Sequence, residues 1–133
     1  MTQVFVDSFY LLALFNPRDA AHDKAMASSR SIPNQLVATD WVFIEVADAL
    51  SNPANRVACV EFIDDFRRSP RVVIISSSRE LFERGWQLYA ARPDKDWSLT
   101  DCISFTVMQE LGITDALTGD HHFEQAGFKA LLR

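Results

Sequence analysis

The sequence predicts a three-layer α/β/α protein with helices on both faces of a central, mainly parallel sheet of four to five strands. Short apolar segments rich in β-branched residues alternate along the chain with longer segments of helical character. Consecutive parallel strands need a crossover, usually a helix, so this alternation favours a parallel sheet. The chain has 133 residues, 48% of them hydrophobic, and only four Gly and five Pro interrupt it. This length suits a single domain over residues 1–133 and is too short for two ordinary ones.

Five segments are expected to be strands because they are short, apolar and bounded by turn residues. The clearest is Arg71–Ser76, which follows Pro70 and holds a run of β-branched residues. Such residues favour the pleated surface of a sheet. The other expected strands are Gln3–Asp7, Gln35–Thr39, Ile113–Leu117 and, at an edge of the sheet, Phe128–Leu132.

Helices are expected between these strands, and residues that commonly begin or end helices mark several of them. Asp40 and Ser98 are expected N-caps. Pro53 suits a first helical turn, and Gly112 suits the position just after a helix. The expected helices are Ser8–Phe15, Arg18–Arg30, Trp41–Leu50, Pro53 to about Arg68, Ser78–Ala91 and Leu99–Leu111. A polar loop, Arg92–Trp97, and a turn over residues 118–122 are expected in the second half of the chain.

Composition argues against several classes of protein. The longest apolar stretch, Phe9–Phe15, is far shorter than the roughly 20 residues that span a bilayer, and no basic leader precedes it, so we expect a cytoplasmic protein without a membrane. Cys59 and Cys102 form no CxxC pair, which indicates neither a disulfide framework nor a zinc site. The net charge of −5 argues against a nonspecific DNA coat, but a local basic rim leaves nucleic acid open as a partner.

Four acidic residues lie where a predicted strand ends or a predicted helix begins: Asp7, Glu45, Asp101 and Asp120. Parallel strands share one carboxyl end, and in open α/β sheets the ligand crevice lies beyond it. We therefore expect the four carboxylates to converge on one site. Like charges at close range repel unless a cation neutralises them, and oxygen ligands of this kind favour Mg²⁺ or Mn²⁺.

Each of these acids also has a local explanation. Asp7 and Asp120 could be N-caps, and Asp101 could complement a helix dipole. Glu45 is the strongest exception, because it lies among apolar neighbours, where a carboxylate is seldom buried unless it is paired or bound to metal. Taken together, the four positions favour a shared site.

Four segments of the chain, one around each acid, resemble in order and spacing the acidic motifs of PIN-domain ribonucleases. These segments are Val4–Ser8, Thr39–Glu45, Ser98–Ser104 and Ala116–Phe123. Leu12–Phe15 and Glu124–Phe128 are similar to the bacterial branch that contains VapC-type toxins. The resemblance implies a PIN-like fold, one or two Mg²⁺ or Mn²⁺ ions on the matching acids, cleavage of single-stranded RNA, a homodimer, and an antitoxin partner. The alternative is a catalytically silent PIN-like module that binds RNA or a protein.

Three other residues near these motifs can each be interpreted in two ways. Asp115 is either a fifth acid or an exposed residue at a strand end, and Ser8 and Thr118 either hold water or phosphate or form local caps. His121 and His122 are expected to be solvated, because adjacent residues in a turn point in different directions. Trp97 is the tryptophan best placed to stack on a base.

Gly119 and Cys102 depart from the residues common in the resembled family at their positions, although neither removes an acid. No Ser, Cys or His is placed with a convincing base and orienting partner, so we expect attack by water and products with a 5′-phosphate and a 3′-hydroxyl.

The early helices are crowded with aromatic residues, some of which are expected to form an exposed dimer contact. These are Phe9, Tyr10, Trp41, Phe43, Phe62 and Phe66, with Lys24, Arg67, Arg68 and Arg71 as candidate phosphate contacts.

Overall fold

A computed structural model describes residues 2–31 and 35–133 and contains a five-stranded sheet in the order β3-β2-β1-β4-β5. Every neighbouring pair of strands is parallel, as predicted, with Val4 opposite Leu36 and Phe5 opposite Ala116. The strands are β1 (Gln3–Val6), β2 (Gln35–Thr39), β3 (Val72–Ile75), β4 (Asp115–Leu117) and β5 (Lys129–Ala130).

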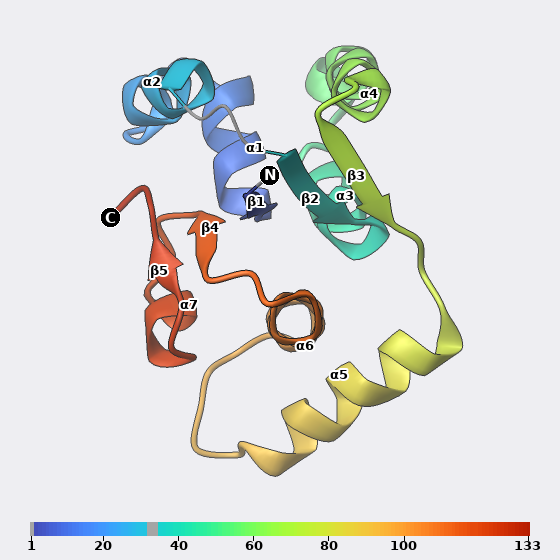
Figure 1. Cartoon of the computed structure of the whole chain (residues 1–133). Coiled ribbons are helices and arrows are strands. Elements are labelled where there is room, and N and C mark those ends of the chain that lie inside the picture. Colours follow the sequence, from blue (N-terminus) through green and yellow to red (C-terminus); the bar gives the residue numbers. More distant parts are fainter. Residues whose placement is uncertain (1, 32–34) are drawn as a thin grey trace.

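Helices cover both faces of the sheet, which confirms the predicted α/β/α layering. On one side lie α1, α2 and α4, and on the other lie α5, α6 and α7 (Figure 1). The helices are α1 (Ser8–Phe15), α2 (His22–Ser31), α3 (Asp40–Ala49), α4 (Pro53–Arg68), α5 (Arg79–Ala91), α6 (Leu99–Leu111) and α7 (His121–Gln125).

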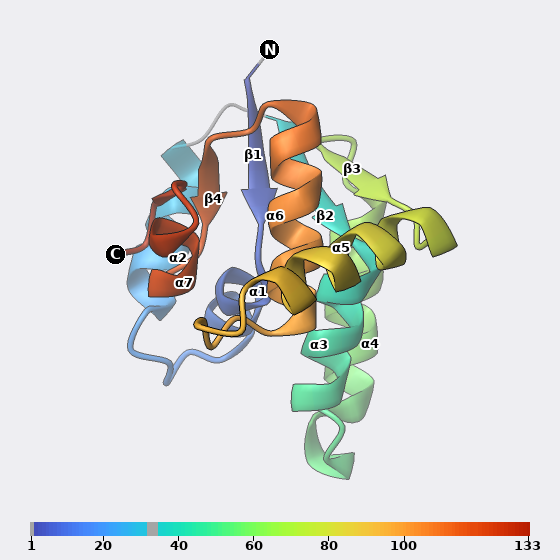
Figure 2. The ribbon, with the colours of Figure 1, turned by 90° about the horizontal axis from the view of Figure 1, so that it is seen from below.

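The strand order places a topological switch point between β1 and β4. From β1 the chain moves outward through β2 to β3, then crosses to the other side of β1 for β4 and β5. Figure 2 shows α1 and α3 at the end of the sheet where β1 ends, with the start of α6 beside them. In open α/β sheets, a ligand crevice forms at this place, because the connections leave a strand end uncovered there.

The core is formed by the sheet together with α1, α3 and α6, each of which contributes fully buried apolar side chains. Val4, Phe5 and Val6 of β1 are buried, and so are Ile103 and Met108 of α6. Helix α5 lies directly on α6 because its Gly85 has no side chain. A Cβ atom at Gly85 would lie 2.3 Å from Cγ1 of Ile103. This close approach explains a glycine in the middle of a helix, where it otherwise costs roughly 0.5–1 kcal/mol relative to Ala.

The second helix begins at His22 and not at Arg18. The side chain of Asn16 accepts a hydrogen bond from the backbone N–H of Arg18, and that of Asp19 accepts one from Ala21. Such side-chain bonds stabilise turns in competition with a first helical turn.

Asp40 was wrongly predicted as the N-cap of α3. The cap is Thr39, whose hydroxyl accepts a hydrogen bond from the backbone N–H of Val42 at 3.2 Å. Asp40 is the first helical residue, and its Oδ2 accepts a hydrogen bond from the backbone N–H of Ser77 at 2.7 Å. A side chain from β2 thus caps the helix, while Asp40 holds the segment after β3.

The expected exposed aromatic patch on the early helices is wrong in its residues. Tyr10 and Phe43 are buried, and Phe9, Trp41, Phe62 and Phe66 pack against the core. The exposed large apolar side chains of the described residues are Ile44, Val57, Val60, Trp86, Tyr89 and Leu111. Within residues 2–31 and 35–133, no helix has the length and apolar character to cross a membrane.

Candidate functional site

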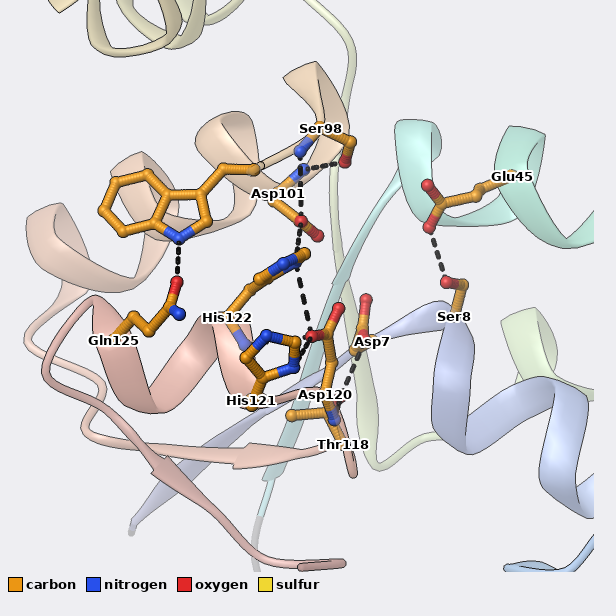
Figure 3. A network of polar contacts seen from close by, with 11 residues as sticks. Asp7, Ser8, Glu45, Ser98, Asp101, Thr118, Asp120, His121, His122 and Gln125 are labelled. Carbon is orange, nitrogen blue, oxygen red and sulfur yellow. Dashed lines mark hydrogen bonds and ion pairs between the residues drawn. The ribbon is translucent and has the colours of Figure 1, made fainter. Parts of the chain in front are cut away.

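The four predicted acids line one cavity of about 430 Å³ at the carboxyl end of the sheet. Asp7 follows β1 directly, and Asp120 follows β4 after a two-residue link. Asp101 lies in the first turn of α6, and Glu45 lies in α3, which begins where β2 ends. Their carboxylates come from four separate elements and approach the same region (Figure 3). The structure therefore places all four acids around one cavity.

Asp7 is the most deeply buried of the four, with 3% of its surface exposed. Its Oδ2 accepts a hydrogen bond from the hydroxyl of Thr118 at 2.7 Å. Burial raises the pKa of Asp7 to about 7, against the Thr118 hydrogen bond, and the charges of Asp101 and Glu45 raise it further. The carboxylate form of Asp7 is thus costly in the absence of a neutralising partner.

Asp101 takes part in capping the start of α6 and also lines the cavity that it shares with the other acids. It forms a capping box with Ser98, whose hydroxyl accepts from the N–H of Asp101 at 3.0 Å, while Oδ2 of Asp101 accepts from the N–H of Ser98 at 3.2 Å. The same carboxylate is 7% exposed and faces the cavity. Burial raises its pKa, and the charge of Asp120 adds to this effect. Capping therefore fixes Asp101 without removing it from the site.

Glu45 reaches the cavity from α3 and is held by Ser8. The Ser8 hydroxyl donates to Oε1 of Glu45 at 2.5 Å. Burial raises the pKa of Glu45, and the charges of Asp101 and Asp120 raise it as well. Ser8 and Thr118 thus orient two of the acids, a role that the sequence reading did not assign to them.

The expectation that both histidines are solvated is wrong for His122. Residues 121–125 form α7, and Asp120 caps it by accepting from the N–H of His122 at 2.9 Å. Nδ1 of His122 lies 3.2 Å from Oδ2 of Asp101 and 3.3 Å from Oδ1 of Asp120, and only 18% of its side chain is exposed. His121 is 56% exposed, with Nδ1 at 3.6 Å from Asp120.

A short helix in place of the expected turn brings both imidazoles beside one carboxylate. Ligand atoms of Asp120, His121 and His122 lie within 4.8 Å of one another. The signal in the sequence was Asp120 itself, because Asp is a favoured N-cap residue and therefore indicates a helix start.

Two secondary candidates do not join the cavity. Asp115 begins β4, at the opposite end of that strand from Asp120, and its partner is the hydroxyl of Thr114. Trp97 is buried, with its ring in a T-shaped contact with Phe105 and its Nε1–H donating to Gln125 at 3.0 Å. The suggestion that Trp97 stacks on a base is therefore wrong, because neither face of a buried ring is free for one.

Both departures from the family pattern have a structural setting. A Cβ atom at Gly119 would lie 2.4 Å from Cζ of Phe9, so the Phe9 ring fills the space that a larger residue would need. Cys102 is buried beside Asp101, and its pKa is raised to about 11, mainly by burial. A thiol of that kind is protonated at neutral pH and is a poor nucleophile.

The donor set of this cavity fits a hard divalent cation. Its oxygen ligands are carboxylates from separate elements, three of which have raised pKa values because they are buried and face like charges. A divalent cation would offset the cost of burying these carboxylates and the repulsion between them. Carboxylate oxygens are also the donors that Mg²⁺ and Mn²⁺ prefer. Asp7, Glu45, Asp101 and Asp120 line this cavity, and we propose that they would hold the ion.

Comparison with known proteins gives a consistent result. The family model described as PIN domain matches residues 4–129. The 23S rRNA-specific endonuclease VapC20 of Mycobacterium tuberculosis, from strain CDC 1551 / Oshkosh and from strain ATCC 25618 / H37Rv, is 30% identical over 125 residues. The match covers 94% of this chain and 95% of the relative.

Solved structures with the same fold include the crystal structure of M. tuberculosis VapC20, described as a Sarcin-Ricin loop cleaving toxin. It matches with a TM-score of 0.86 and 29% identity, over 94% of this chain and 95% of that chain. VapBC2 from Rickettsia felis, bound to a DNA fragment from its promoter, has a TM-score of 0.68 and 12% identity, over 97% and 96% of the two chains. A toxin–antitoxin complex from Klebsiella pneumoniae has a TM-score of 0.62 and 19% identity, over 89% and 87%. The last two show the fold alone.

Proposed function

The chain belongs to the PIN-domain family, and we propose on this premise that it is a metal-dependent endoribonuclease that hydrolyses phosphodiester bonds of single-stranded RNA. The observation that carries the proposal is the convergence of four carboxylates in one cavity, with Asp7 buried among them. Burying several carboxylates close together costs free energy, and groups perturbed in this way cluster at functional sites. A bound cation would offset that cost.

The substrate and the biological role are supported by similarity to VapC20. That relative is described as a 23S rRNA-specific endonuclease, and its structure as that of a toxin. We therefore propose RNA, including single-stranded loops of structured RNA, as the substrate, and the toxin of a toxin–antitoxin pair as the role. An antitoxin protein would then be a second partner.

A divalent cation held by the four acids would make a water molecule easier to deprotonate and would neutralise charge on the phosphate. The other residues act on the acids themselves. Thr118 orients Asp7, Ser8 orients Glu45, and His122 lies between Asp101 and Asp120. Cys102 is protonated at neutral pH and is a poor nucleophile. We therefore expect water to attack the phosphorus and the bond to the 3′ oxygen to break, so that the products carry a 5′-phosphate and a 3′-hydroxyl.

Assembly and location are part of the proposal. We expect a cytoplasmic homodimer whose contact includes α3 and α4, because Ile44, Val57 and Val60 on these helices are more than half exposed. Solvent-exposed apolar side chains on adjacent helices suit a protein contact. Two of the candidate phosphate contacts are engaged locally, since Arg67 pairs with Asp64 and Arg68 pairs with Asp65. Light scattering of Val57→Glu with Val60→Glu tests the dimer, with Leu111→Glu as the control, and a wild-type monomer would contradict it.

The nuclease proposal is tested with the purified chain and a labelled single-stranded RNA. Mg²⁺ and Mn²⁺ should each support cleavage, and EDTA should stop it. Products should carry a 5′-phosphate, whereas a 2′,3′-cyclic phosphate would indicate attack by the RNA's own 2′-hydroxyl and would contradict the mechanism. Binding of RNA without any cleavage would favour the silent module over the enzyme.

A further inference from the structure

A second cavity, of about 540 Å³, lies between the end of α5 and the loop that leads to α6. We propose that it is a subsite for the RNA strand that continues from the acid cavity, with bases stacked on Trp86 and Tyr89 and a phosphate bound by Lys95. This inference rests on the proposed ribonuclease function and names where its substrate extends. We call the surface formed by Trp86, Tyr89, Arg92 and Lys95 the aromatic groove.

The aromatic rings on α5 form a nearly parallel stack. The rings of Phe82 and Trp86 have centroids 6.3 Å apart and an interplanar angle of 8°, and those of Trp86 and Tyr89 are 5.6 Å apart at 16°. Trp86 is 49% exposed and Tyr89 is 45% exposed. Partly exposed aromatic rings are the kind of surface on which single-stranded bases stack, in a way that tolerates any sequence.

Cationic groups line the same groove. Lys95 forms no ion pair with any described residue, although its backbone N–H bonds to Arg92. Arg92 lies over the Trp97 ring, with its guanidinium carbon 5.1 Å from the ring centroid, and makes two hydrogen bonds of 2.9 Å to Asp94. Because Asp94 neutralises Arg92, Lys95 is the group best placed to attract a phosphate.

The aromatic groove is continuous with the acid cavity. Asp96 lines both of them. Around it, Trp97 and Cys102 line the groove, while their chain neighbours Ser98 and Asp101 line the acid cavity. Asp96 and Ser98, at the end of the loop that leads to α6, line the acid cavity together with Asp7 and Ser8 at the start of α1. A strand with one phosphate at the acids would therefore pass into the groove within a few nucleotides.

The combination of features favours RNA over a protein as the occupant. A flexible strand needs ring faces and a cation along a path that ends at the reactive site, and the groove has all three. The exposed aliphatic side chains suited to a protein contact, Ile44, Val57 and Val60, lie on α3 and α4.

The test measures binding of a fluorescent ten-nucleotide RNA by anisotropy, in EDTA and in the Asp7→Asn background, so that the strand stays intact. Trp86→Ala with Tyr89→Ala should weaken binding by at least about 30-fold, from the typical contribution of two stacked bases. Trp86→Phe with Tyr89→Phe should retain most of the affinity, because both rings remain. Leu111→Ala, which changes a similarly exposed apolar residue on α6, should have no effect.

The salt dependence of RNA affinity tests the proposed phosphate contact of Lys95 separately. Lys95→Gln should lower the slope of log affinity against log salt by about 0.7, the value for one phosphate contact on a single strand. Lys129→Gln is the matched control, because Lys129 lies opposite Asp115 at the far end of the sheet from the acid cavity and lines neither that cavity nor the groove, so it should leave the slope unchanged.

The two proposals fail separately. If the wild-type chain cleaves RNA but the doubly substituted Ala variant binds like its parent, the groove is overturned and the nuclease stands. If no RNA is cleaved but the Ala variant loses binding, the groove stands and the nuclease is overturned. Unchanged RNA binding together with a lower mass in light scattering would show that the rings cover a protein contact, which also overturns the groove.

Discussion

The hydroxyl of Thr118 donates a 2.7 Å hydrogen bond to Oδ2 of Asp7, and thereby joins two residues 111 positions apart in the chain. The same hydroxyl accepts a hydrogen bond from the backbone N–H of Asp120 at 3.0 Å. One buried side chain thus fixes the ends of β1 and β4 relative to each other and orients an acid that follows each strand. The geometry of the site therefore depends on a residue that is not itself acidic.

Replacing Thr118 by Val should weaken divalent metal binding most strongly near neutral pH. The hydrogen bond from Thr118 opposes the rise in the pKa of Asp7, so its loss should raise that pKa further. A hydrogen bond to a charged group contributes about 1.5–3 kcal/mol, which corresponds to roughly one to two pKa units. Protons then compete with the cation up to a higher pH. Titration of Mg²⁺ or Mn²⁺ at pH 6, 7 and 9 measures this effect.

Thr118→Ser keeps the hydroxyl and serves as the control, with affinity close to that of the wild type. An equal loss of affinity in both variants at every pH would show that the methyl group, and not the hydrogen bond, supports the site.

Replacing Asp7 by Asn should stabilise the metal-free protein at high pH. The pKa of Asp7 is about 7 in the folded protein against 3.8 for the free side chain. Between these values, the folded state holds a proton that the unfolded state has released, so the stability of the wild type falls as pH rises through this window. Above it, the penalty is at most a few kcal/mol, at about 1.36 kcal/mol per pKa unit.

Thermal melting in EDTA checks the direction of this change in stability. Asp7→Asn should melt several degrees above the wild type at pH 8, and this advantage should disappear near pH 4. Added Mg²⁺ should raise the melting temperature of the wild type more than that of the variant, because binding to the folded state stabilises it. A variant that melts below the wild type at pH 8 in EDTA would contradict the argument.

Asp101→Asn should reduce RNA cleavage by at least about 100-fold, because the proposed metal site loses one of its buried carboxylates. Asp115→Asn is a matched control. It makes the same change of side chain at the far end of β4, outside the acid cavity, and should leave cleavage within about twofold of the wild type. Initial rates on one RNA at saturating Mn²⁺ compare the two. Comparable losses in both variants would place the reacting region outside the four-acid cavity.

Replacing Gly85 by Ala should destabilise the protein although Ala is the better helix former. The added Cβ would meet Cγ1 of Ile103 at 2.3 Å and its Cα at 3.2 Å. Overpacking of a core typically costs 1–3 kcal/mol, against roughly 0.5–1 kcal/mol gained from helix propensity. Chemical denaturation measures the difference.

A double-mutant cycle with Ile103→Ala separates the cost of overpacking from the gain in helix propensity. In that background the 2.3 Å contact with Cγ1 is removed and only the milder 3.2 Å contact with Cα remains, so Gly85→Ala should cost much less, and the coupling energy should exceed about 0.5 kcal/mol. Additive effects would show that the two helices do not meet at this point.

Much of the architecture follows from local patterns in the sequence. The helices Ser8–Phe15, Pro53–Arg68 and Leu99–Leu111 have the predicted bounds, because apolar runs and cap residues such as Ser98 and Gly112 specify them locally. The alternation of strands and helices determined the parallel sheet. It also determined that Asp7 and Asp120 share an edge, since a parallel strand can end only there.

Only the tertiary structure decided how the side chains around that edge interact. Thr118 meets Asp7, and Ser8 meets Glu45, through distances in space that no sequence spacing encodes. His122 turns toward the acids because residues 121–125 close into a helix, and Trp97 is buried because Phe105 and Gln125 surround it. A carboxylate can be located by its place in the chain, but its partners, its burial and its pKa depend on which elements pack beside it. The fold brings those elements together from across the whole chain, and this step lies beyond any local pattern.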